Sequence, residues 1–164
     1  EYSMVKALRV DERLIHGQVA MAWTRDLGIQ GIMVADDEAA SNEMQKMTLK
    51  MAVPDGIKCI IKTVPEIIAL LNNPRSEGMR ILVLVKTVKN ALEVYKAVPG
   101  IEYVNIGNAG RFTSGDGTER TIISRSVSLT PDEVEALKEL AALAPDTALQ
   151  MVPSDEKKLV SEVL

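Results

Sequence analysis

One junction decides the fold predicted for this chain of 164 residues: Val10-Asp11-Glu12-Arg13-Leu14-Ile15-His16-Gly17-Gln18-Val19. The apolar run before it, residues 4–10, is typical of a buried first strand. After it, apolar residues recur at helical spacing, namely Val19, Ala22, Trp23 and Leu27. The junction therefore predicts a strand that passes into a helix, with His16 at the corner. In an open α/β fold such a corner lies at the carboxyl end of the sheet, where ligands usually bind.

Strand and helix signals alternate along the rest of the chain. Further strands are expected at residues 31–35, 57–62, 79–85, 101–106 and 148–152, with helices between them and a last helix capped by Ser154. The run Ile81-Leu82-Val83-Leu84-Val85 is apolar throughout, as in a central strand buried on both faces. We therefore expect one α/β domain over residues 4–164, with a mostly parallel sheet of about six or seven strands and helices on both faces.

Residues 107–125 break this alternation. A glycine-rich run, Gly107-Asn108-Ala109-Gly110, follows a predicted strand, and Asp116-Gly117 then lies between two β-prone segments, which favours a hairpin turn. A short antiparallel excursion is expected here. The glycine-rich run matches neither a P-loop nor the dinucleotide fingerprint. Two interpretations of Gly107 and Asn108 stay open: a tight turn, or a loop that approaches a phosphate or a partner.

Composition excludes several classes of protein. The net charge of −4 and the absence of a Lys/Arg-rich block argue against a nucleic-acid binder. The single cysteine, Cys59, allows no internal disulfide and fits a reducing compartment, and we expect it to be a small buried hydrophobe. No apolar run approaches the roughly 18 residues of a membrane span, so no direct membrane insertion is expected. Residues 1–3 are expected to be a cloning remnant before a native start at Met4.

His16 is the only histidine, and its surroundings suggest phosphoryl chemistry. Gly17 lets the backbone approach a ligand closely, and the helix N-terminus beyond it offers free N–H groups to an anion. Arg13 adds a planar donor fork suited to phosphate. A nucleophilic imidazole beside these groups favours a histidine that carries a phosphoryl group; a purely structural histidine is the alternative.

Four further charged residues are candidates for supporting roles. Asp11 either orients Arg13 or His16, or caps the turn. Arg9, at the end of the first strand, is expected to point at the site or to be paired. Asp36 and Asp37 follow the second strand and are expected to neighbour His16, where they cap a helix, orient the histidine or begin a metal site. Because no further His or Cys stands at ligand spacing, we reject the metal.

Three methionines, Met44, Met47 and Met51, continue a helical spacing from Ala40. We expect a helix, capped by Ser41 or Asp37, that buries them in the core. A soft docking surface is the alternative interpretation, since methionine adapts to irregular partners.

The stretch Asp11–Val19 resembles the phosphorylation-site signature of IIB subunits in the mannose family of the bacterial sugar phosphotransferase system. That family includes sorbose-, fructose- and N-acetylgalactosamine-type transporters. The resemblance covers essentially the whole chain, with weaker similar runs at Asp36-Asp37, Lys50-Met51-Ala52-Val53-Pro54 and Val152-Pro153-Ser154-Asp155.

This resemblance implies a function. His16 would accept phosphate from the phosphohistidine of a IIA protein or domain and pass it to a sugar bound by the membrane IIC and IID subunits. The activity would be that of a protein-N(pi)-phosphohistidine–sugar phosphotransferase, without a cofactor, in the cytoplasm and peripheral to the transporter; a homo-oligomer is left open. Two alternatives remain: a receiver-like regulator, suggested by Lys86 and the acidic pair, and a non-catalytic module that binds a small molecule or nucleotide.

Overall fold

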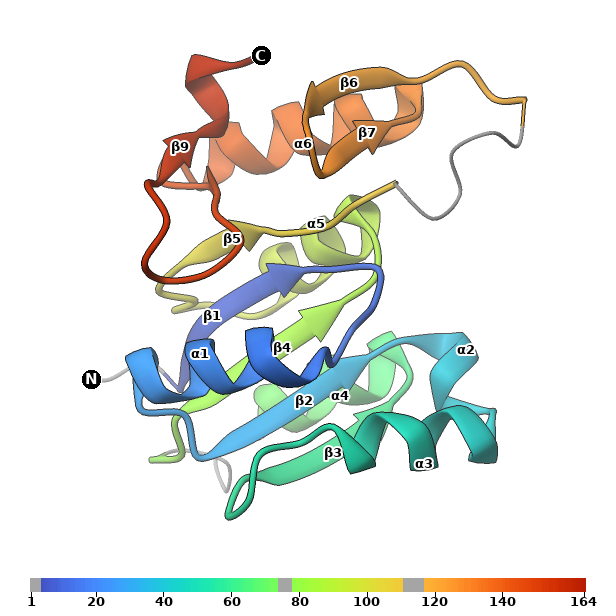
Figure 1. Cartoon of the computed structure of the whole chain (residues 1–164), viewed down its shortest axis with the longest axis vertical. Coiled ribbons are helices and arrows are strands. Elements are labelled where there is room, and N and C mark those ends of the chain that lie inside the picture. Colours follow the sequence, from blue (N-terminus) through green and yellow to red (C-terminus); the bar gives the residue numbers. More distant parts are fainter. Residues whose placement is uncertain (1–3, 74–77, 111–116) are drawn as a thin grey trace.

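A seven-stranded sheet with the order β3-β2-β4-β1-β5-β8-β9 forms the centre of the fold (Figure 1). The computed structural model describes residues 4–73, 78–110 and 117–164. The strands of this sheet are β1 (Val5–Val10), β2 (Gly31–Ala35), β3 (Lys58–Lys62), β4 (Ile81–Val85), β5 (Val104–Ile106), β8 (Ala148–Leu149) and β9 (Lys158–Leu159). Every pairing is parallel except that of β8 with β9. The predicted mostly parallel α/β sheet is confirmed.

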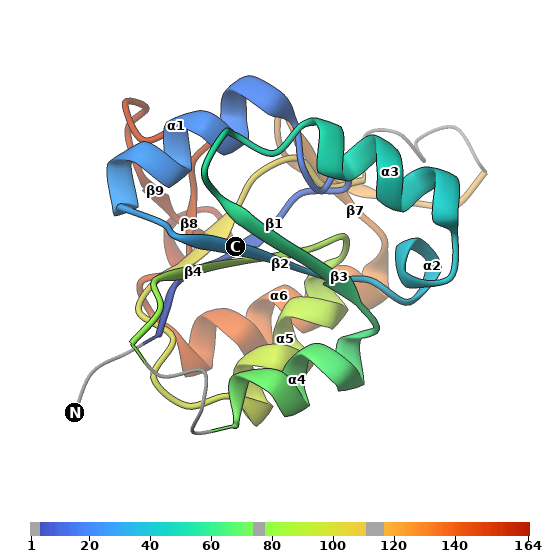
Figure 2. The same cartoon turned by 90° about the horizontal axis from the view of Figure 1, so that it is seen from below.

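Helices cover both faces of the sheet (Figure 2). On one face lie α1 (Gly17–Leu27) and α3 (Glu43–Met51); on the other lie α4 (Val64–Leu71), α5 (Val88–Ala97) and α6 (Pro131–Leu143). Strand β4 connects the two layers, because Val83 packs into one apolar cluster and its neighbours Leu82 and Leu84 into the other. Alternate side chains of a strand point to opposite faces, so a strand covered on both sides must be apolar throughout.

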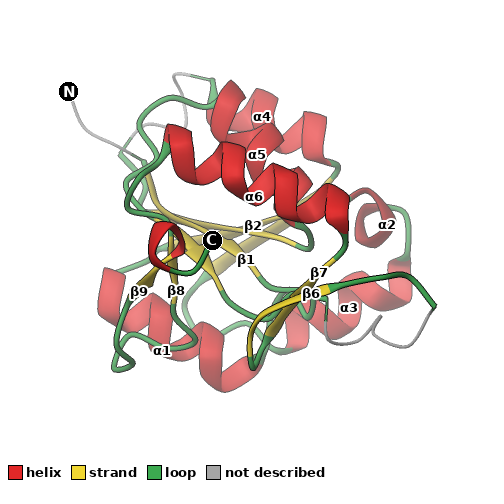
Figure 3. Cartoon of the chain, turned by 90° about the horizontal axis from the view of Figure 1, so that it is seen from above, coloured by secondary structure: helices red, strands yellow, loops and turns green. Residues whose placement is uncertain are grey.

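The predicted antiparallel excursion is confirmed by a two-stranded sheet. Strands β6 (Thr121–Ser124) and β7 (Val127–Leu129) pair antiparallel, so the chain reverses at Arg125-Ser126. The predicted turn at Asp116-Gly117 falls at residues 111–117, most of which lie outside the described residues, so it stays a prediction. Val127 and Leu129 are buried, which anchors β7 to the core, and β6 pairs with it. Ala109, just beyond β5, bridges to Val127, so the hairpin lies toward the carboxyl ends of the parallel strands (Figure 3).

The predicted last helix from Ser154 is wrong. Lys158 and Leu159 instead form the edge strand β9, followed by a short 3₁₀ helix, η2 (Val160–Glu162). Val160 is fully buried and donates its N–H to the carbonyl of Thr147 at 2.9 Å. This contact holds the C-terminal segment against the sheet, and the residues just before Val160 are extended as strand β9.

The expected continuous helix with a buried methionine stripe is also wrong. A four-residue helix, α2 (Asp37–Ala40), ends before α3 begins, and the caps are Asp36 and Asn42. Met44, Met47 and Met51 are 78%, 64% and 81% exposed. Helix α3 lies at the edge of the fold, where it turns the opposite side, with Leu49 buried, toward the core. Helical spacing identifies a shared face, but it does not say whether that face meets the sheet or the solvent.

Candidate functional site

His16 lies at the corner that the sequence predicts, as the N-cap residue of α1. Its carbonyl accepts the N–H of Ala20 at 2.8 Å, but its side chain makes no capping hydrogen bond. The imidazole is exposed, and within the described residues it has no hydrogen-bond partner. A ring nitrogen is therefore accessible from solvent, and the first N–H groups of the helix are not occupied by this side chain.

The space above the start of α1 is open. A β-carbon added to Gly17 would meet no heavy atom within 4 Å, and the first turn of the helix carries no acidic side chain. The positive end of the helix dipole is thus uncompensated by a nearby carboxylate. An anion such as a phosphoryl group is favoured at this position.

Asp11 holds Arg13 by a bidentate ion pair. Nε of Arg13 donates to Oδ1 of Asp11 at 3.0 Å and Nη2 to Oδ2 at 2.9 Å, and the Arg13 backbone N–H also donates to Oδ1 at 3.0 Å. The hydrogen bond to Asp11 raises the pKa of Arg13. The guanidinium is therefore fixed in one orientation, with Nη1 outside these bonds. Asp11 therefore both orients the Arg13 side chain and caps the turn through the Arg13 backbone N–H.

Arg9 is paired, and it is buried. Its Nη2 donates to Oδ2 of Asp11 at 3.1 Å, and its Nη1 donates to Asn105 and, at 3.1 Å, to the carbonyl of Gln150. The guanidinium also lies 5.5 Å from the centre of the Trp23 ring. Burial lowers the pKa of Arg9, and the carboxylate of Asp11 opposes that change. The two guanidiniums share the carboxylate of Asp11, and the nearby carboxylate of Glu12 also acts on Arg13.

Gly107 and Asn108 hold the β1–α1 loop from the neighbouring strand. Gly107 donates its N–H to the carbonyl of Val10 at 2.8 Å, and its Cα lies against the guanidinium of Arg9. Asn108 accepts the N–H of Glu12 at 2.8 Å and donates from Nδ2 to the Glu12 carboxylate at 2.9 Å. Both residues thus hold the β1–α1 loop in place, and the two interpretations of Gly107 and Asn108 stay predictions.

Leu14 adopts a left-handed backbone conformation between Arg13 and His16. Its φ is 61°, and its side chain is buried. Such a conformation costs a branched residue on the order of 1–3 kcal/mol and persists only where neighbouring contacts fix it. Here the Leu14 N–H donates to the carbonyl of Asp11 at 2.8 Å. The loop that carries His16 is therefore set by the same aspartate that holds the arginines.

Sequence reasoning missed a group of residues that pack beside Arg9 and Arg13, namely Trp23, Tyr103, Asn105, Gln150 and Met151. Tyr103 donates from its hydroxyl to Oε1 of Gln150 at 2.8 Å, and Asn105 donates from Nδ2 to the Gln150 carbonyl at 2.9 Å. Trp23 donates from Nε1 to the carbonyl of Met151 at 3.0 Å, and the Met151 sulfur lies 3.5 Å from Nη2 of Arg13. One signal was available: Asn105 is a polar residue inside the apolar run of β5, and buried polar groups need partners.

Comparison with known proteins shows the family of this chain. Residues 5–164 match the family model of the PTS system sorbose subfamily IIB component. The chain belongs to this family. A probable phosphotransferase enzyme IIB component of Streptococcus pyogenes is 44% identical over 162 residues, covering 98% of this chain and 99% of the relative. The mannose-specific EIIAB component of Escherichia coli is 29% identical over the whole chain, which spans 49% of that protein.

A solved structure supports the same assignment. The IIBSor domain of the sorbose permease from Klebsiella pneumoniae is 25% identical and superposes with a TM-score of 0.87, covering 97% of this chain and 94% of that one. The protein is thus a phosphoryl-transfer subunit of a sugar phosphotransferase system, as the resemblance of Asp11–Val19 predicted. IIB components work within that system with IIA and IIC/IID partners.

The acidic pair of this IIB component caps helices. Asp36 accepts the N–H of Ala39 at 3.0 Å, and Asp37 accepts the N–H of Val64 at 2.9 Å. Because β4 lies between β1 and β2, the sheet order separates the pair from the strand that leads to His16, and the expected neighbour relation does not follow. A receiver-like regulator is not favoured either, since its sheet order would be 2-1-3-4-5.

Metal ligands and membrane spans are also absent from the described part of this IIB component. No three His, Cys, Asp or Glu side chains gather as a metal site in residues 4–73, 78–110 and 117–164. Along the same ranges no helix combines the length and apolarity needed to cross a bilayer.

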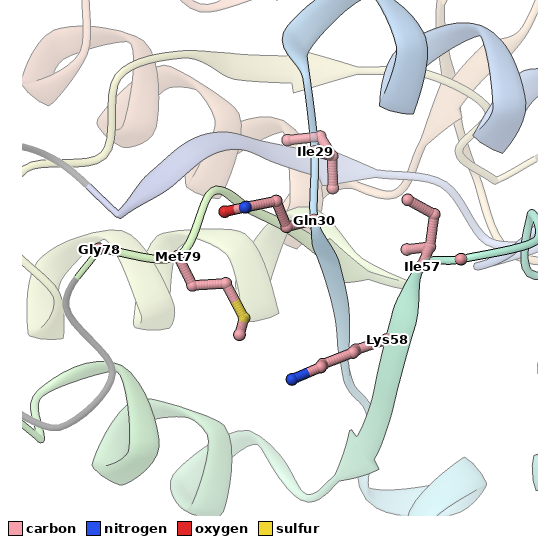
Figure 4. A pocket seen from close by; sticks show the side chains of 7 residues that line it. Ile29, Gln30, Ile57, Lys58, Gly78 and Met79 are labelled. Carbon is pink, nitrogen blue, oxygen red and sulfur yellow. The ribbon is translucent and has the colours of Figure 1, made fainter.

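A separate cavity of about 560 Å³ lies at the opposite, amino edge of the sheet (Figure 4). Lys58 and Met79 extend into it. Among the described residues its lining consists of Ile29, Gln30, Gly56, Ile57, Lys58, Gly78 and Met79, and of these Lys58 alone is charged. The cavity lies at the far end of the strands from His16.

Proposed function

We propose that His16 is the phosphoryl acceptor of this IIB component. It takes the group from a phosphohistidine of a IIA protein and gives it to a sugar bound by membrane IIC and IID subunits. One observation carries the proposal: the imidazole is exposed at the N-terminus of α1, and its side chain is not used to cap the helix. The subunit would work in the cytoplasm, peripheral to the transporter.

The first step is an exchange of P–N bonds. The lone pair of a His16 ring nitrogen attacks phosphorus, a new P–N bond forms, the bond to the donor imidazole breaks, and its electron pair returns to the donor nitrogen. Little other covalent chemistry is needed, so positioning and charge stabilisation dominate. The N–H groups of α1 and Nη1 of Arg13, whose guanidinium Asp11 fixes in place, stabilise the phosphoryl oxygens, and the buried Arg9 adds long-range positive charge.

The second step delivers the group to the sugar. A sugar hydroxyl attacks phosphorus, the P–N bond to His16 breaks, and the proton of that hydroxyl neutralises the released nitrogen. The reaction class is that of a protein-N(pi)-phosphohistidine–sugar phosphotransferase. The E. coli relative is named EIIAB, and this chain matches 49% of that protein's length. A name that combines IIA and IIB supports a IIA donor for this chain.

Intact-mass measurement tests the proposal. The chain is incubated with phosphoenolpyruvate, the general phosphotransferase proteins and a IIA protein; one phosphoryl mass is expected, lost in acid and kept in alkali. His16→Ala is expected to gain none, and labelling retained by that variant would refute the assignment. A non-catalytic binding module would show thermal stabilisation by a ligand without any covalent mass.

A further inference from the structure

The exposed methionines of α3 form a contiguous apolar surface. Met44, Met47 and Met51 are spaced three and four residues apart, so they lie on one side of the helix, and each is more than three-fifths exposed. We call these three side chains the methionine stripe. Thr48, between them in sequence, is polar and exposed. A contiguous exposed apolar patch on a soluble protein usually marks an interaction site.

The methionine stripe begins beside the phosphoryl site. In Figures 1 and 2 the C-terminal end of α3 lies next to the N-terminal end of α1, where His16 is the cap residue. The apolar packing agrees, because Leu49 of α3 belongs to the same buried cluster as Leu14 and Ile15 of the β1–α1 loop. A partner that reaches His16 from solvent therefore meets the stripe along the same surface.

The size and chemistry of the stripe fit a transient partner better than a second copy of the chain. Three side chains offer an area on the order of a few hundred Å², whereas a stable interface buries about 800 Å² on each partner. Methionine side chains are flexible and polarisable, and they suit surfaces that bind and release. On the same helix, Lys46 is paired with Glu43 at 2.8 Å.

We propose that the methionine stripe docks the IIA phosphoryl donor, whose surface beside its own phosphohistidine would be apolar. This proposal rests on the proposed function of His16. The E. coli relative, matched over 49% of its length and named EIIAB, favours the IIA partner, because two domains in one chain meet at high effective concentration and need only a weak contact.

Steady-state transfer kinetics test the docking surface. The wild-type chain and the triple variant Met44→Gln, Met47→Gln, Met51→Gln are phosphorylated by a IIA protein chosen for saturable transfer to the wild type. The triple variant is expected to raise KM for phosphorylated IIA by about tenfold or more with kcat nearly unchanged, since the three methionine side chains take no part in the transfer step itself. Leu143→Gln, which removes another exposed apolar side chain on α6, is the matched control and should behave like the wild type.

A small-molecule phosphoryl donor allows the docking proposal to be tested separately from the proposed function of His16. Phosphoramidate, which needs no docking, is expected to phosphorylate the wild type and the triple variant at equal rates. Failure to label the wild type with either donor would overturn the proposed function itself. Normal labelling with an unchanged KM for IIA in the triple variant would overturn only the docking proposal.

Two other occupants of the stripe give distinct results. A concentration-dependent dimer in sedimentation, lost in the triple variant, would assign the stripe to a second copy and contradict the proposal. Loss of sugar phosphorylation in vesicles that contain the IIC and IID subunits, with normal kinetics toward IIA, would assign it to the membrane subunits and contradict it as well.

Discussion

The guanidinium of Arg9 lies against the Cα of Gly107, in the space that a β-carbon at position 107 would take. Arg9 ends the first strand and Gly107 follows the fifth, and β1 pairs with β5 in the sheet. The glycine is thus required by packing against a buried charge, since no positive φ is recorded at this residue. This relationship links the candidate site around Arg9 to the strand order, and the first prediction follows from it.

Gly107→Ala is expected to destabilise the fold by about 1–3 kcal/mol, because the added methyl group forces a shift of Arg9 or of the backbone. Urea denaturation measures the change. Gly17→Ala is the matched control: its β-carbon would lie in open space, so its stability should stay within about 0.5 kcal/mol of the wild type. Equal stability of the two variants would contradict the packing argument.

Asp11→Asn is expected to destabilise the protein by about 3–5 kcal/mol, because the buried guanidinium of Arg9 loses its counter-charge. Asp11 is 1% exposed and accepts from both Arg9 and Arg13. Thermal and urea unfolding are the measurements. Asp37→Asn, which weakens a cap at the start of α4, should cost only about 1 kcal/mol, and a similar loss in both variants would argue against a special role for the shared carboxylate.

Arg13→Lys is expected to slow phosphoryl transfer by about 10²-fold while leaving the protein folded, since removing one oriented donor to a developing charge has that order of effect. Lysine keeps the charge but cannot form the bidentate contact with Asp11. Rapid-quench transfer from phosphorylated IIA gives the rate, and circular dichroism checks the fold. A wild-type rate would show that the fork does not act on the phosphoryl group.

Cys59 gives a prediction about pH. It is half-buried rather than fully buried as expected, and burial raises the pKa of its thiol. The folded chain therefore holds less reactive thiolate than the unfolded chain at the same pH, until the pH passes the raised value. The rate of alkylation by iodoacetamide, followed through the alkaline range, should rise at higher pH in buffer than in urea. A midpoint at equal or lower pH in buffer would contradict this.

Local patterns predicted most of the regular structure. The apolar runs at residues 31–35 and 81–85 lie in strands over those same residues, and Thr63 and Thr130, which are common N-cap residues, cap helices. These features depend on neighbours in sequence, which a pattern records. The prediction of a last helix from Ser154 was wrong because Val160 is hydrogen-bonded to Thr147. This contact joins segments that are distant in sequence, and no local pattern contains it.

The part of the site that lies in one contiguous segment could be predicted, and the part that depends on contacts between distant segments could not. The corner position of His16 and the candidates Arg13 and Asp11 follow from one contiguous motif. The contact between Asn105 and Gln150 does not follow from that motif, because it depends on β5 and β8 lying next to each other. The prediction that the methionine stripe is buried was wrong for a third reason. The spacing shows only that the three side chains share one side of the helix, and the tertiary placement of α3 decides whether that side faces the core or the solvent.

The exposure of His16 has a consequence for the phosphorylated form. A phosphoryl group on this ring would remain in contact with water between the two transfers, since the loop provides no cover over it. The lifetime of the charged carrier would then be limited by spontaneous hydrolysis of the P–N bond, and it should lengthen whenever a bound partner shields the ring. Productive flux through the transporter would depend on how quickly the second encounter follows the first.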